Sequence, residues 1–325
     1  MDSDLPEPIK EVNMTIEPKK VGGWYIYDNP EAKENAINVI LIASVHGNEP
    51  YASIIVHKFM DYLKFNHFYE NVKQLVVYPF ANKSGIRARQ RLQQNFSANL
   101  NDGWLTPDYR ASIKELIDSR CSVEGSRTVV IDIHNSPWIE PCFLLEARDS
   151  NCDHIEHALQ VFNKSCGVNN GVDVIKRHTD IETIKSYVNT CYSKTAIGLT
   201  LEIGMMSQAL AHKNYTIHCA DKIDHFIRFI SGSFDIYFDE LPEDFEACDL
   251  CRTLTANSSG ILIYTIDFDD HAYAGDTIAK IMDLDSYTCI DEVKAPFSGK
   301  FIDKINEFYV NAGEVIGIFM PEDDD

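Results

Sequence analysis

The sequence lacks long apolar runs and is poor in basic residues. No apolar stretch reaches the roughly 18 residues that cross a membrane. Of 325 residues, 29 are Lys or Arg against 50 Asp or Glu, which gives a net charge of −21. Nucleic-acid binders need clustered basic side chains, and the densest cluster here is Arg87, Arg89 and Arg91. We therefore expect neither nucleic acid nor an anionic membrane surface as a partner, and attribute the acidity to solubility.

A second pair of cysteines at metal-binding spacing is also missing. Nine Cys are scattered along the chain, and one pair, Cys248 and Cys251, has C-x-x-C spacing. A structural zinc site needs two further Cys or His ligands, and a redox C-x-x-C is expected beside a βαβ unit rather than in an acidic stretch. Residues 1–20 are acidic and interrupted by prolines, unlike a signal peptide. These features predict nine reduced thiols and a cytoplasmic protein.

Apolar, β-rich runs alternate with segments of helical periodicity through the first two thirds of the chain. We predict strands over 38–45, 74–80, 128–133 and 197–203, and helices over 51–63, 109–119, 153–164 and 220–230. Continuous apolar strands that alternate with helices are typical of a mainly parallel sheet covered on both faces. The fold class predicted for residues 1–240 is therefore α/β.

The pattern changes after an acidic stretch near residue 240. From Leu254 onward, short alternating runs are separated by glycine turns, as in ILIYTIDF, GDTIAKIMDL and NAGEVIGIF. This pattern predicts a smaller all-β domain over 250–325.

Metal-ligating and acidic side chains follow or end three of the predicted strands. His46 and Glu49 follow the first, His134 follows the third, and Glu202 lies near the end of the fourth. Open α/β sheets bind ligands at the carboxyl ends of their strands. Two imidazoles and a carboxylate form a ligand set of catalytic zinc, and a further Glu suits the general base. Taken singly, His134 also fits a core histidine, and His46 and Glu49 fit ordinary loop residues.

Together, the motifs SVHGNEP, DIHN and LEIG resemble the succinylglutamate desuccinylase and aspartoacylase family over roughly residues 38–230. These zinc amidohydrolases are related to zinc carboxypeptidases. The resemblance implies a zinc-carboxypeptidase-like α/β/α domain with a mixed, mainly parallel sheet, and hydrolysis of an amide bond. It also implies one Zn²⁺ held by His46, Glu49 and His134, with Glu202 as general base and acid.

The resemblance extends to the segment ANKSGIRARQRLQQNFSANLND. Counting from Asn82 places Arg91 on the family arginine that polarises the substrate carbonyl and stabilises the oxyanion. An insertion leaves Arg87 and Arg89 open as alternatives, and we keep Arg89 as a candidate substrate contact. Asn101 matches the family asparagine that helps to hold the substrate carboxylate.

Two departures from the family pattern concern the substrate. Asp102 stands where relatives place an arginine that binds the α-carboxylate, and Tyr192 and Lys194 lie where a further arginine is expected. A carboxylate cannot form the bidentate clamp of a guanidinium and repels an anion. Asp102 therefore motivates the hypothesis of a substrate with a cationic group near the scissile amide.

The C-terminal segment is similar to biotinyl and lipoyl carrier domains, but it lacks their modified lysine. That lysine would fall near Asp285, in the segment MDLDSYT. We therefore expect a β-sandwich or barrel-like domain without a swinging arm.

The sequence as a whole predicts a zinc-dependent deacylase of a small N-acyl amino acid or related amide. A metallocarboxypeptidase of short peptides and a non-catalytic binding protein are the alternatives. The sequence leaves open another divalent metal and a homo-oligomer.

Overall fold

The computed structural model describes residues 17–65, 69–91, 109–135, 141–166, 171–178, 183–203, 213–248, 250–267, 270–304 and 309–322. Within these ranges the helices are α1 (Tyr51–Phe65), α2 (Lys83–Ala88), α3 (Tyr109–Cys121), α4 (Cys152–Cys166), α5 (Ile184–Cys191), α6 (Lys213–Ser233) and the 3-10 helix η1 (Phe234–Tyr237). The strands up to residue 203 are β1 (Lys19–Val21), β2 (Trp24–Asp28), β3 (Ile37–Ala43), β4 (Val72–Tyr78), β5 (Thr128–Asn135), β6 (Cys142–Glu146), β7 (Asp173–Arg177) and β8 (Ala196–Ile203). The later strands are β9 (Leu250–Thr255), β10 (Gly260–Tyr264), β11 (His271–Ala272), β12 (Thr277–Met282), β13 (Cys289–Lys294), β14 (Gly299–Lys304), β15 (Tyr309–Val310) and β16 (Val315–Pro321).

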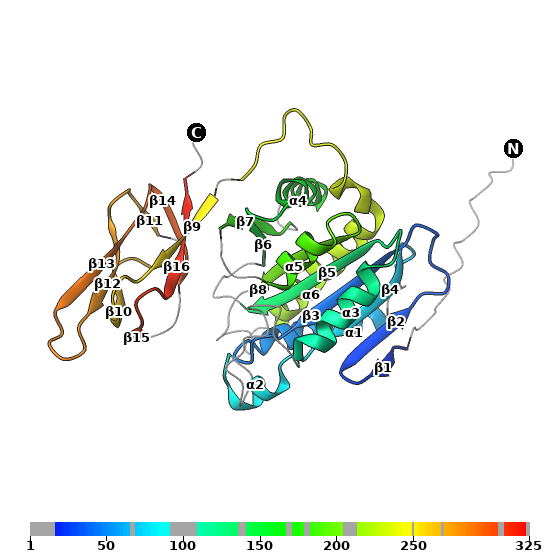
Figure 1. Cartoon of the computed structure of the whole chain (residues 1–325), viewed down its shortest axis with the longest axis horizontal. Helices are drawn as coiled ribbons and strands as arrows, with labels where there is room; N and C mark the ends of the chain where they lie inside the picture. The colour runs from blue at the N-terminus through cyan, green and yellow to red at the C-terminus, as the bar shows by residue number, and fades with distance from the viewer. Residues whose placement is uncertain are drawn as a thin grey trace, which may run out of the picture.

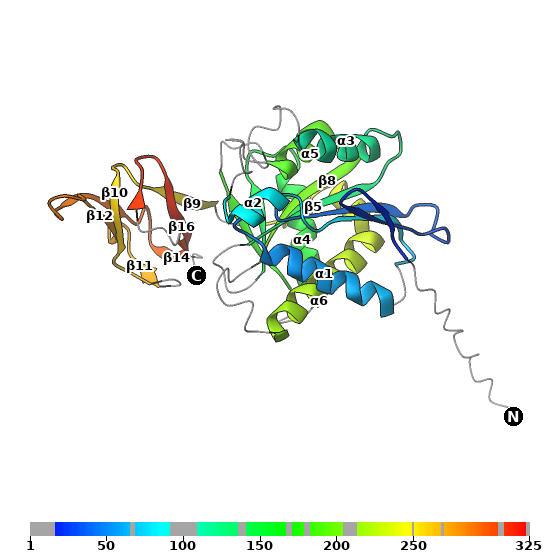
Figure 2. The ribbon, with the colours of Figure 1, turned by 90° about the horizontal axis from the view of Figure 1, so that it is seen from below.

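A large mixed sheet forms the centre of the molecule, in the order β1-β2-β4-β3-β5-β8-β6-β7-β9-β16-β14-β11. Strands β4, β3, β5 and β8 are parallel to one another, whereas β2 and β6 join them antiparallel. Helices cover both faces of this part of the sheet (Figures 1 and 2). The carboxyl ends of β3, β5 and β8 therefore meet at one edge.

Alternation along each strand divides the core into two layers. In β5, Val129, Ile131 and Ile133 pack with α1, α4 and α6, whereas Val130 packs with α3 and α5. Because successive side chains point to opposite faces of a sheet, Asp132 and His134 lie on the α3 and α5 face. The same alternation in β8 places Glu202 on that face, since Leu201 and Ile203 belong to the other layer.

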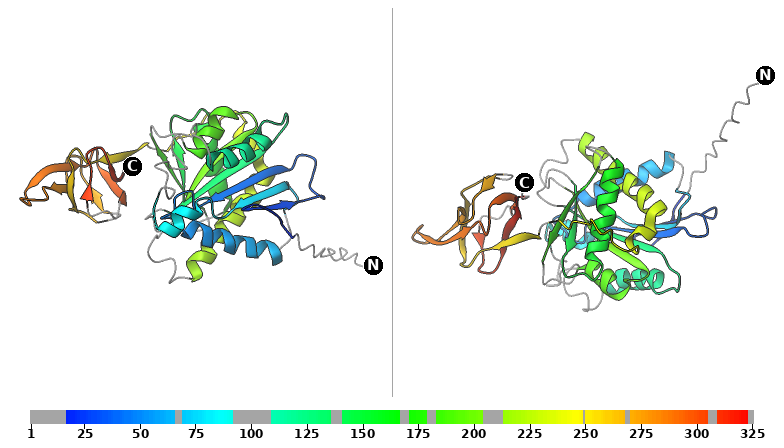
Figure 3. Two further views of the ribbon diagram at one scale, coloured as in Figure 1. Left: turned by 60° about the horizontal axis from the view of Figure 1, so that its bottom comes forward. Right: turned by 90° about the horizontal axis from the view of Figure 1, so that it is seen from above.

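The C-terminal strands form a second, antiparallel sheet, in the order β13-β12-β10-β15, which packs on the far strands of the large one. Figure 3 shows this region standing apart from the helical layers. It is joined to them through β9, which pairs in parallel with β7. An apolar cluster, here called the seam, spans this junction. Its buried members are Cys142, Leu144, Ile175, Cys251, Ile302 and Ile318.

The α/β architecture and the all-β C-terminal region agree with the sequence predictions. Each of the four predicted strands and four predicted helices is present with ends shifted, most for α6, which begins seven residues earlier than predicted. Four strands in the α/β part of the large sheet lie outside the predicted ones: β1, β2, β6 and β7. β1 has three residues and the others five each, and β7 (DVIKR) has only two apolar residues. The turn between β12 and β13 spans 283–288 and contains no lysine.

Candidate metal centre

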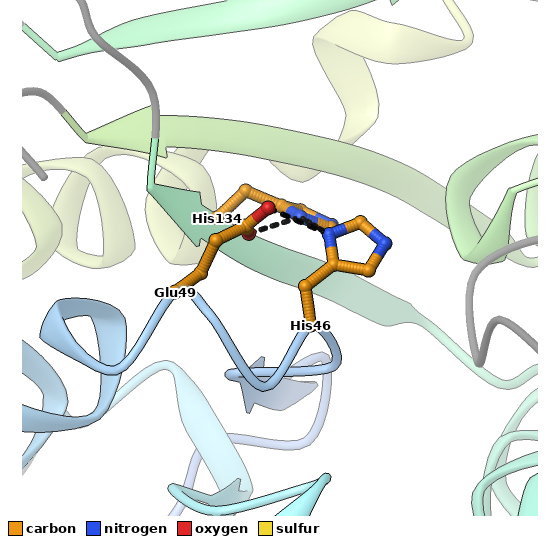
Figure 4. A group of neighbouring side chains, drawn as sticks. All are labelled: His46, Glu49 and His134. Carbon is orange, nitrogen blue, oxygen red and sulfur yellow. Dashed lines mark hydrogen bonds and ion pairs between the residues drawn. The ribbon is translucent and has the colours of Figure 1, made fainter. Parts of the chain in front are cut away.

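Three predicted metal ligands meet at the carboxyl edge of the sheet. His46 and Glu49 lie in the loop between β3 and α1, and His134 is the second-last residue of β5 (Figure 4). The Nδ1 atom of His46 is 2.8 Å from Oε1 of Glu49, and Nδ1 of His134 is 3.0 Å from Oε2. The two Nδ1 atoms are 3.1 Å apart. All three side chains are buried, so they converge on one enclosed point.

The loop that carries His46 and Glu49 is held in a tight conformation. Ser44 adopts a left-handed backbone with φ of 56°, which is uncommon for a residue with a side chain. Its hydroxyl donates to the carbonyl oxygen of Glu49 at 2.9 Å and lies 2.6 Å from the hydroxyl of Ser53 in α1. The loop is thereby tied to the helix that follows, which turns both ligands inward.

Gly47 allows the loop to touch the segment around α2. A Cβ atom added at Gly47 would lie 2.1 Å from the carbonyl carbon of Gly85 and 2.3 Å from the carbonyl oxygen of Gln90. The Gly47 N–H also donates to the carbonyl oxygen of Arg91 at 3.1 Å. Only glycine permits this approach of two backbones.

Asp132 fixes the orientation of the His134 ring. Its Oδ2 atom lies 2.8 Å from His134 Nε2, which leaves Nδ1 facing His46 and Glu49. A carboxylate on the far nitrogen of a ligating histidine sets the tautomer and raises ligand basicity. Asp132 has no predicted role, although its D-x-H spacing on a strand places the Asp132 and His134 side chains on one face of the sheet.

Arg91 contacts the predicted metal ligands through Glu49. Its Nη1 donates to Glu49 Oε1 at 2.8 Å, while the guanidinium remains half exposed. The backbone N–H of Asn135 donates to Glu49 Oε2 at 3.3 Å, and the Asn135 side chain accepts from the Ala52 N–H at the start of α1. The Glu49 carboxylate therefore accepts hydrogen bonds from Arg91 and Asn135 in addition to its contacts with the two histidines.

Glu202 lies across the ladder from His134, because the two residues are paired in the β5–β8 register. Its side chain is half-buried. Burial raises the pKa of the Glu202 carboxyl above its usual range, although the nearby His134 opposes the rise. Burial also disfavours the charged form of Glu49, but His46 and His134 hold the pKa of that carboxyl well below its usual range. Two neighbouring carboxyl groups with pKa values pushed apart are a feature of acid–base sites.

The donor set fits a divalent metal ion. One atom each from His46, Glu49 and His134 lies within 4.8 Å of the others, and all three are buried. Imidazole nitrogen and carboxylate oxygen are zinc ligands, and three protein ligands are typical of a catalytic site with an open position. The Nδ1 atoms of His46 and His134, 3.1 Å apart, are near enough to bind the same cation.

The other predicted site residues are Arg89, Asn101 and Asp102. Arg89 is the left-handed residue that ends α2, and the side chains of Arg87 and Arg89 are exposed. Asn101 and Asp102 lie outside the described residues. The structure therefore brings Arg91, rather than Arg87 or Arg89, to the candidate metal centre.

Tyr192 does not reach the metal centre. Its hydroxyl donates to Asp118 of α3 at 2.7 Å. It precedes β8, and the six steps from Ala196 to Glu202 span about 20 Å. Tyr192 and Lys194 therefore lie at the opposite edge of the sheet from Glu202.

A second group of potential ligands is already neutralised by a lysine. Cys152, Asp153 and Glu156 of α4 lie close together, but Lys176 contacts Asp153 at 2.8 Å and Glu156 at 3.0 Å. The Cys248 N–H donates to Glu156. All nine cysteines are free thiols, including Cys248 and Cys251.

Comparisons with known proteins connect the fold to the family suggested by the sequence. No family model and no curated protein matches the chain. Solved structures that match include several at 12–16% identity. The product-bound ectoine utilization protein EutE from Ruegeria pomeroyi has a TM-score of 0.65 at 15% identity, over 91% of this chain and 87% of that one.

Two further structures carry the family's names. An aspartoacylase family protein from Mesorhizobium loti has a TM-score of 0.65 at 15% identity, over 93% of this chain and 89% of that one. A succinylglutamate desuccinylase from Silicibacter has a TM-score of 0.63 at 16% identity, over 92% and 88%. The chain therefore has the fold of the succinylglutamate desuccinylase and aspartoacylase proteins over nearly its whole length.

Proposed function

We propose that this protein is a zinc-dependent deacylase that hydrolyses the amide bond of a small N-acyl amino acid or related compound. The observation that carries the proposal is the convergence of His46, Glu49 and His134 on one buried point, where Arg91 contacts Glu49 and Glu202 lies on the strand beside His134. The shared fold with desuccinylase and aspartoacylase structures supports the same chemistry.

Each residue has a defined role in this proposal. His46, Glu49 and His134 hold one Zn²⁺, which when bound activates a water molecule and polarises a carbonyl. Glu202 takes the proton of the attacking water and gives it to the leaving amine, a task suited to a carboxyl group whose pKa is raised. Arg91 donates hydrogen bonds to the carbonyl oxygen as it gains negative charge. Asp132 keeps the His134 ring oriented.

The substrate is proposed to be a small molecule rather than a macromolecule. One matching structure is that of an ectoine utilization protein with its product bound. We further propose that Asn101 and Arg89 contact the substrate, and that Asp102 favours a cationic group near the amide. Turnover of N-acetyl-lysine, compared with N-acetyl-aspartate, tests this preference. A clear preference for N-acetyl-aspartate would overturn it.

Metal analysis together with one substitution tests the proposed function. We expect one zinc ion per purified chain. Glu202→Gln should retain the zinc and lose about 10²–10⁴-fold in kcat, because the general base is removed while the ligands remain. Glu115→Gln, an exposed residue of α3, is the matched control and should retain full activity. The assay uses a panel of N-acyl amino acids and short peptides.

Three results would contradict the proposal. A protein that neither contains nor takes up a divalent metal excludes the ligand set. Zinc that survives His46→Ala but is lost with Cys248→Ser moves the metal to the C-x-x-C segment. Hydrolysis confined to short peptides identifies a metallocarboxypeptidase instead.

We also propose that the chain comprises two domains, residues 1–240 and 250–325, and that it is cytoplasmic. Nine free thiols suit a reducing compartment. Within the described residues, no helix is long and apolar enough to cross a membrane. The −21 net charge favours neither nucleic acid nor an anionic membrane as a partner.

Elution volume in size-exclusion chromatography with light scattering would determine whether the protein forms a homo-oligomer.

A further inference from the structure

We propose that Asn82 is a positioning residue that places Arg91 and the His46 loop relative to each other, an inference that rests on the proposed function. Asn82 lies between β4 and α2 and is 1% exposed. Its amide makes four hydrogen bonds, which divide between two tasks. The amide oxygen accepts hydrogen bonds at the start of α2. The amide nitrogen donates to the backbone of Val45, next to His46, and to the backbone of Arg91.

The oxygen of the Asn82 amide caps α2. Oδ1 accepts from the Gly85 N–H at 2.8 Å and from the Ser84 hydroxyl at 3.3 Å. Such a cap is an ordinary role for Asn at a helix start. This half of the side chain would be equally well served by Ser or Asp.

The nitrogen has no role in the cap. Nδ2 donates to the carbonyl oxygen of Val45 at 3.2 Å and to that of Arg91 at 3.3 Å. Val45 immediately precedes the ligand His46, and the Arg91 guanidinium contacts the ligand Glu49. The buried Asn82 amide therefore connects the backbone of Val45, next to the proposed ligand His46, with the backbone of Arg91. The Arg91 side chain in turn contacts the proposed ligand Glu49.

The surrounding backbone bonds reinforce this connection. The Asn82 N–H donates to the Ser44 carbonyl at 3.0 Å, and the Gly47 N–H donates to the Arg91 carbonyl at 3.1 Å. The Arg91 carbonyl thus accepts from both Asn82 and Gly47. Without the amide nitrogen, the Arg91 carbonyl keeps the Gly47 N–H as its donor among the described residues, and the backbone that carries the half-exposed guanidinium is less firmly placed.

Asn82→Ser separates the two tasks. Ser keeps an oxygen for the Gly85 N–H and removes both donors to the carbonyl groups. We expect kcat on an N-acyl amino acid to fall about 10²-fold with little change in KM, because misplacing a group by about 1 Å has that effect. Zinc release to a chelator should accelerate about 10-fold, as is typical when the outer support of a metal site is altered.

Asn29 provides a matched control far from the site. Its Nδ2 donates to the carbonyl oxygens of Tyr69 and Val72, both at 3.0 Å, and its Oδ1 accepts from the Glu31 N–H at 3.1 Å. Asn29→Ser removes the same kinds of bond and should lower thermal stability while leaving kcat and zinc release unchanged. A general loss of packing would affect both variants alike.

A double-mutant cycle tests whether Asn82 acts through Arg91. In the Arg91→Ala background, Asn82→Ser should lower kcat by less than threefold, since the group that it positions is absent. Asn82→Asp is the second variant if Asn82→Ser fails to fold. Asp keeps the size of the side chain and the oxygen that caps α2, but it turns a carboxylate oxygen toward the carbonyl oxygens of Val45 and Arg91. We therefore expect the same loss of kcat.

The outcomes separate this inference from the proposed function. If the wild-type protein binds zinc and hydrolyses its substrate, but Asn82→Ser behaves like Asn29→Ser, the positioning role is wrong and the function stands. Equal losses from Asn82→Ser with and without Arg91 would also overturn it. A wild-type protein without zinc or activity would overturn both.

Discussion

At the scale of residues, Lys185 and Glu146 form a buried ion pair outside the candidate site. The Nζ of Lys185 lies 2.7 Å from Glu146 Oε1, with side chains 2% and 0% exposed. Burial lowers the pKa of Lys185, although the Glu146 charge opposes this effect. Because both groups are desolvated, removal of one partner leaves a poorly compensated charge in the core.

Lys185→Met should destabilise the fold by up to about 3–5 kcal/mol, because it leaves the buried Glu146 charge with only the longer contact to Arg177, whose Nε lies 3.9 Å from Glu146 Oε1. The measurement is the free energy of unfolding from urea titration. Lys33→Met is the matched control, since its pair with Glu70 is 57% and 69% exposed and should contribute under about 1 kcal/mol.

A double variant tests whether the buried Glu146 charge causes the loss of stability in Lys185→Met. Lys185→Met combined with Glu146→Leu should recover part of the stability, because the fully buried carboxylate is gone and only Arg177, which is 25% exposed, loses a contact. Equal effects for Lys185→Met and Lys33→Met would contradict the assignment.

Residue-level chemistry was the part of the site most open to prediction from sequence. The sequence could predict that His46, Glu49 and His134 lie close together, because all three follow or end strands of one sheet. Asp132 has only the D-x-H spacing as a signal, and its contact with His134 Nε2 depends on the orientation of that ring. Counting from Asn82 placed Arg91 with Arg87 and Arg89 as alternatives, and the contact with Glu49 favours Arg91.

At the scale of elements, α3 and α5 are connected by one carboxylate. Asp118 of α3 accepts from the hydroxyls of Tyr187 and Tyr192 at 2.6 and 2.7 Å and pairs with Lys114. Burial disfavours the charged form of Asp118, but these hydrogen bonds lower the pKa of the carboxyl below its usual value. The connection holds both helices over the face of the sheet that carries Asp132 and His134.

The contribution of Asp118 to stability should depend on pH in one direction. A carboxyl whose pKa is lowered on folding stabilises above its unfolded value of about 4, and the effect disappears as pH falls through the folded value. Asp118→Asn should therefore be less stable than wild type at neutral pH, with the difference closing in acid. Urea titrations across the pH range measure this.

Glu115→Gln, at an exposed position of the same helix, is the control and should show no comparable gap at neutral pH. A difference between wild type and Asp118→Asn that widens on acidification would show that Asp118 does not act as the charged acceptor.

Elements were predictable where their own pattern was strong. The buried strands β3, β5 and β8 are continuous apolar runs, so their sequence alone indicates them. Strands β6 and β7 are short, and β7 has charged residues at three of five positions; pairing with β8 and β9 makes them strands. The positions of Asn101 and Asp102 stay predictions.

At the scale of the whole molecule, the seam joins the C-terminal strands to the α/β part. Ile302 and Ile318 contribute from β14 and β16, and Cys142, Leu144 and Ile175 contribute from β6 and β7. Cys142 is paired with Glu202 in the β6–β8 register. The seam therefore begins one strand away from the proposed general base.

Ile318→Ala should destabilise the fold by about 2–5 kcal/mol, because the side chain is 2% exposed and its loss leaves a cavity in the seam. Thermal unfolding, followed by circular dichroism, measures the change. Val315→Ala on the same strand is the control, since Val315 is 44% exposed and its truncation should cost less than about 0.5 kcal/mol. Equal shifts for the two variants would mean that the seam contributes nothing to stability.

The sequence by itself determined the α/β class, the change to short strands after residue 250, and the residues that face one another at the candidate metal centre. These follow from local periodicity and from the chemistry of His, Glu and Asp side chains, which a single chain displays. The tertiary structure decided which arginine reaches Glu49, where Tyr192 lies, and what Asp132 and Asn82 contact. Those facts depend on how distant backbones approach each other, as Gly47 and Gly85 do, and no spacing along the chain encodes that distance.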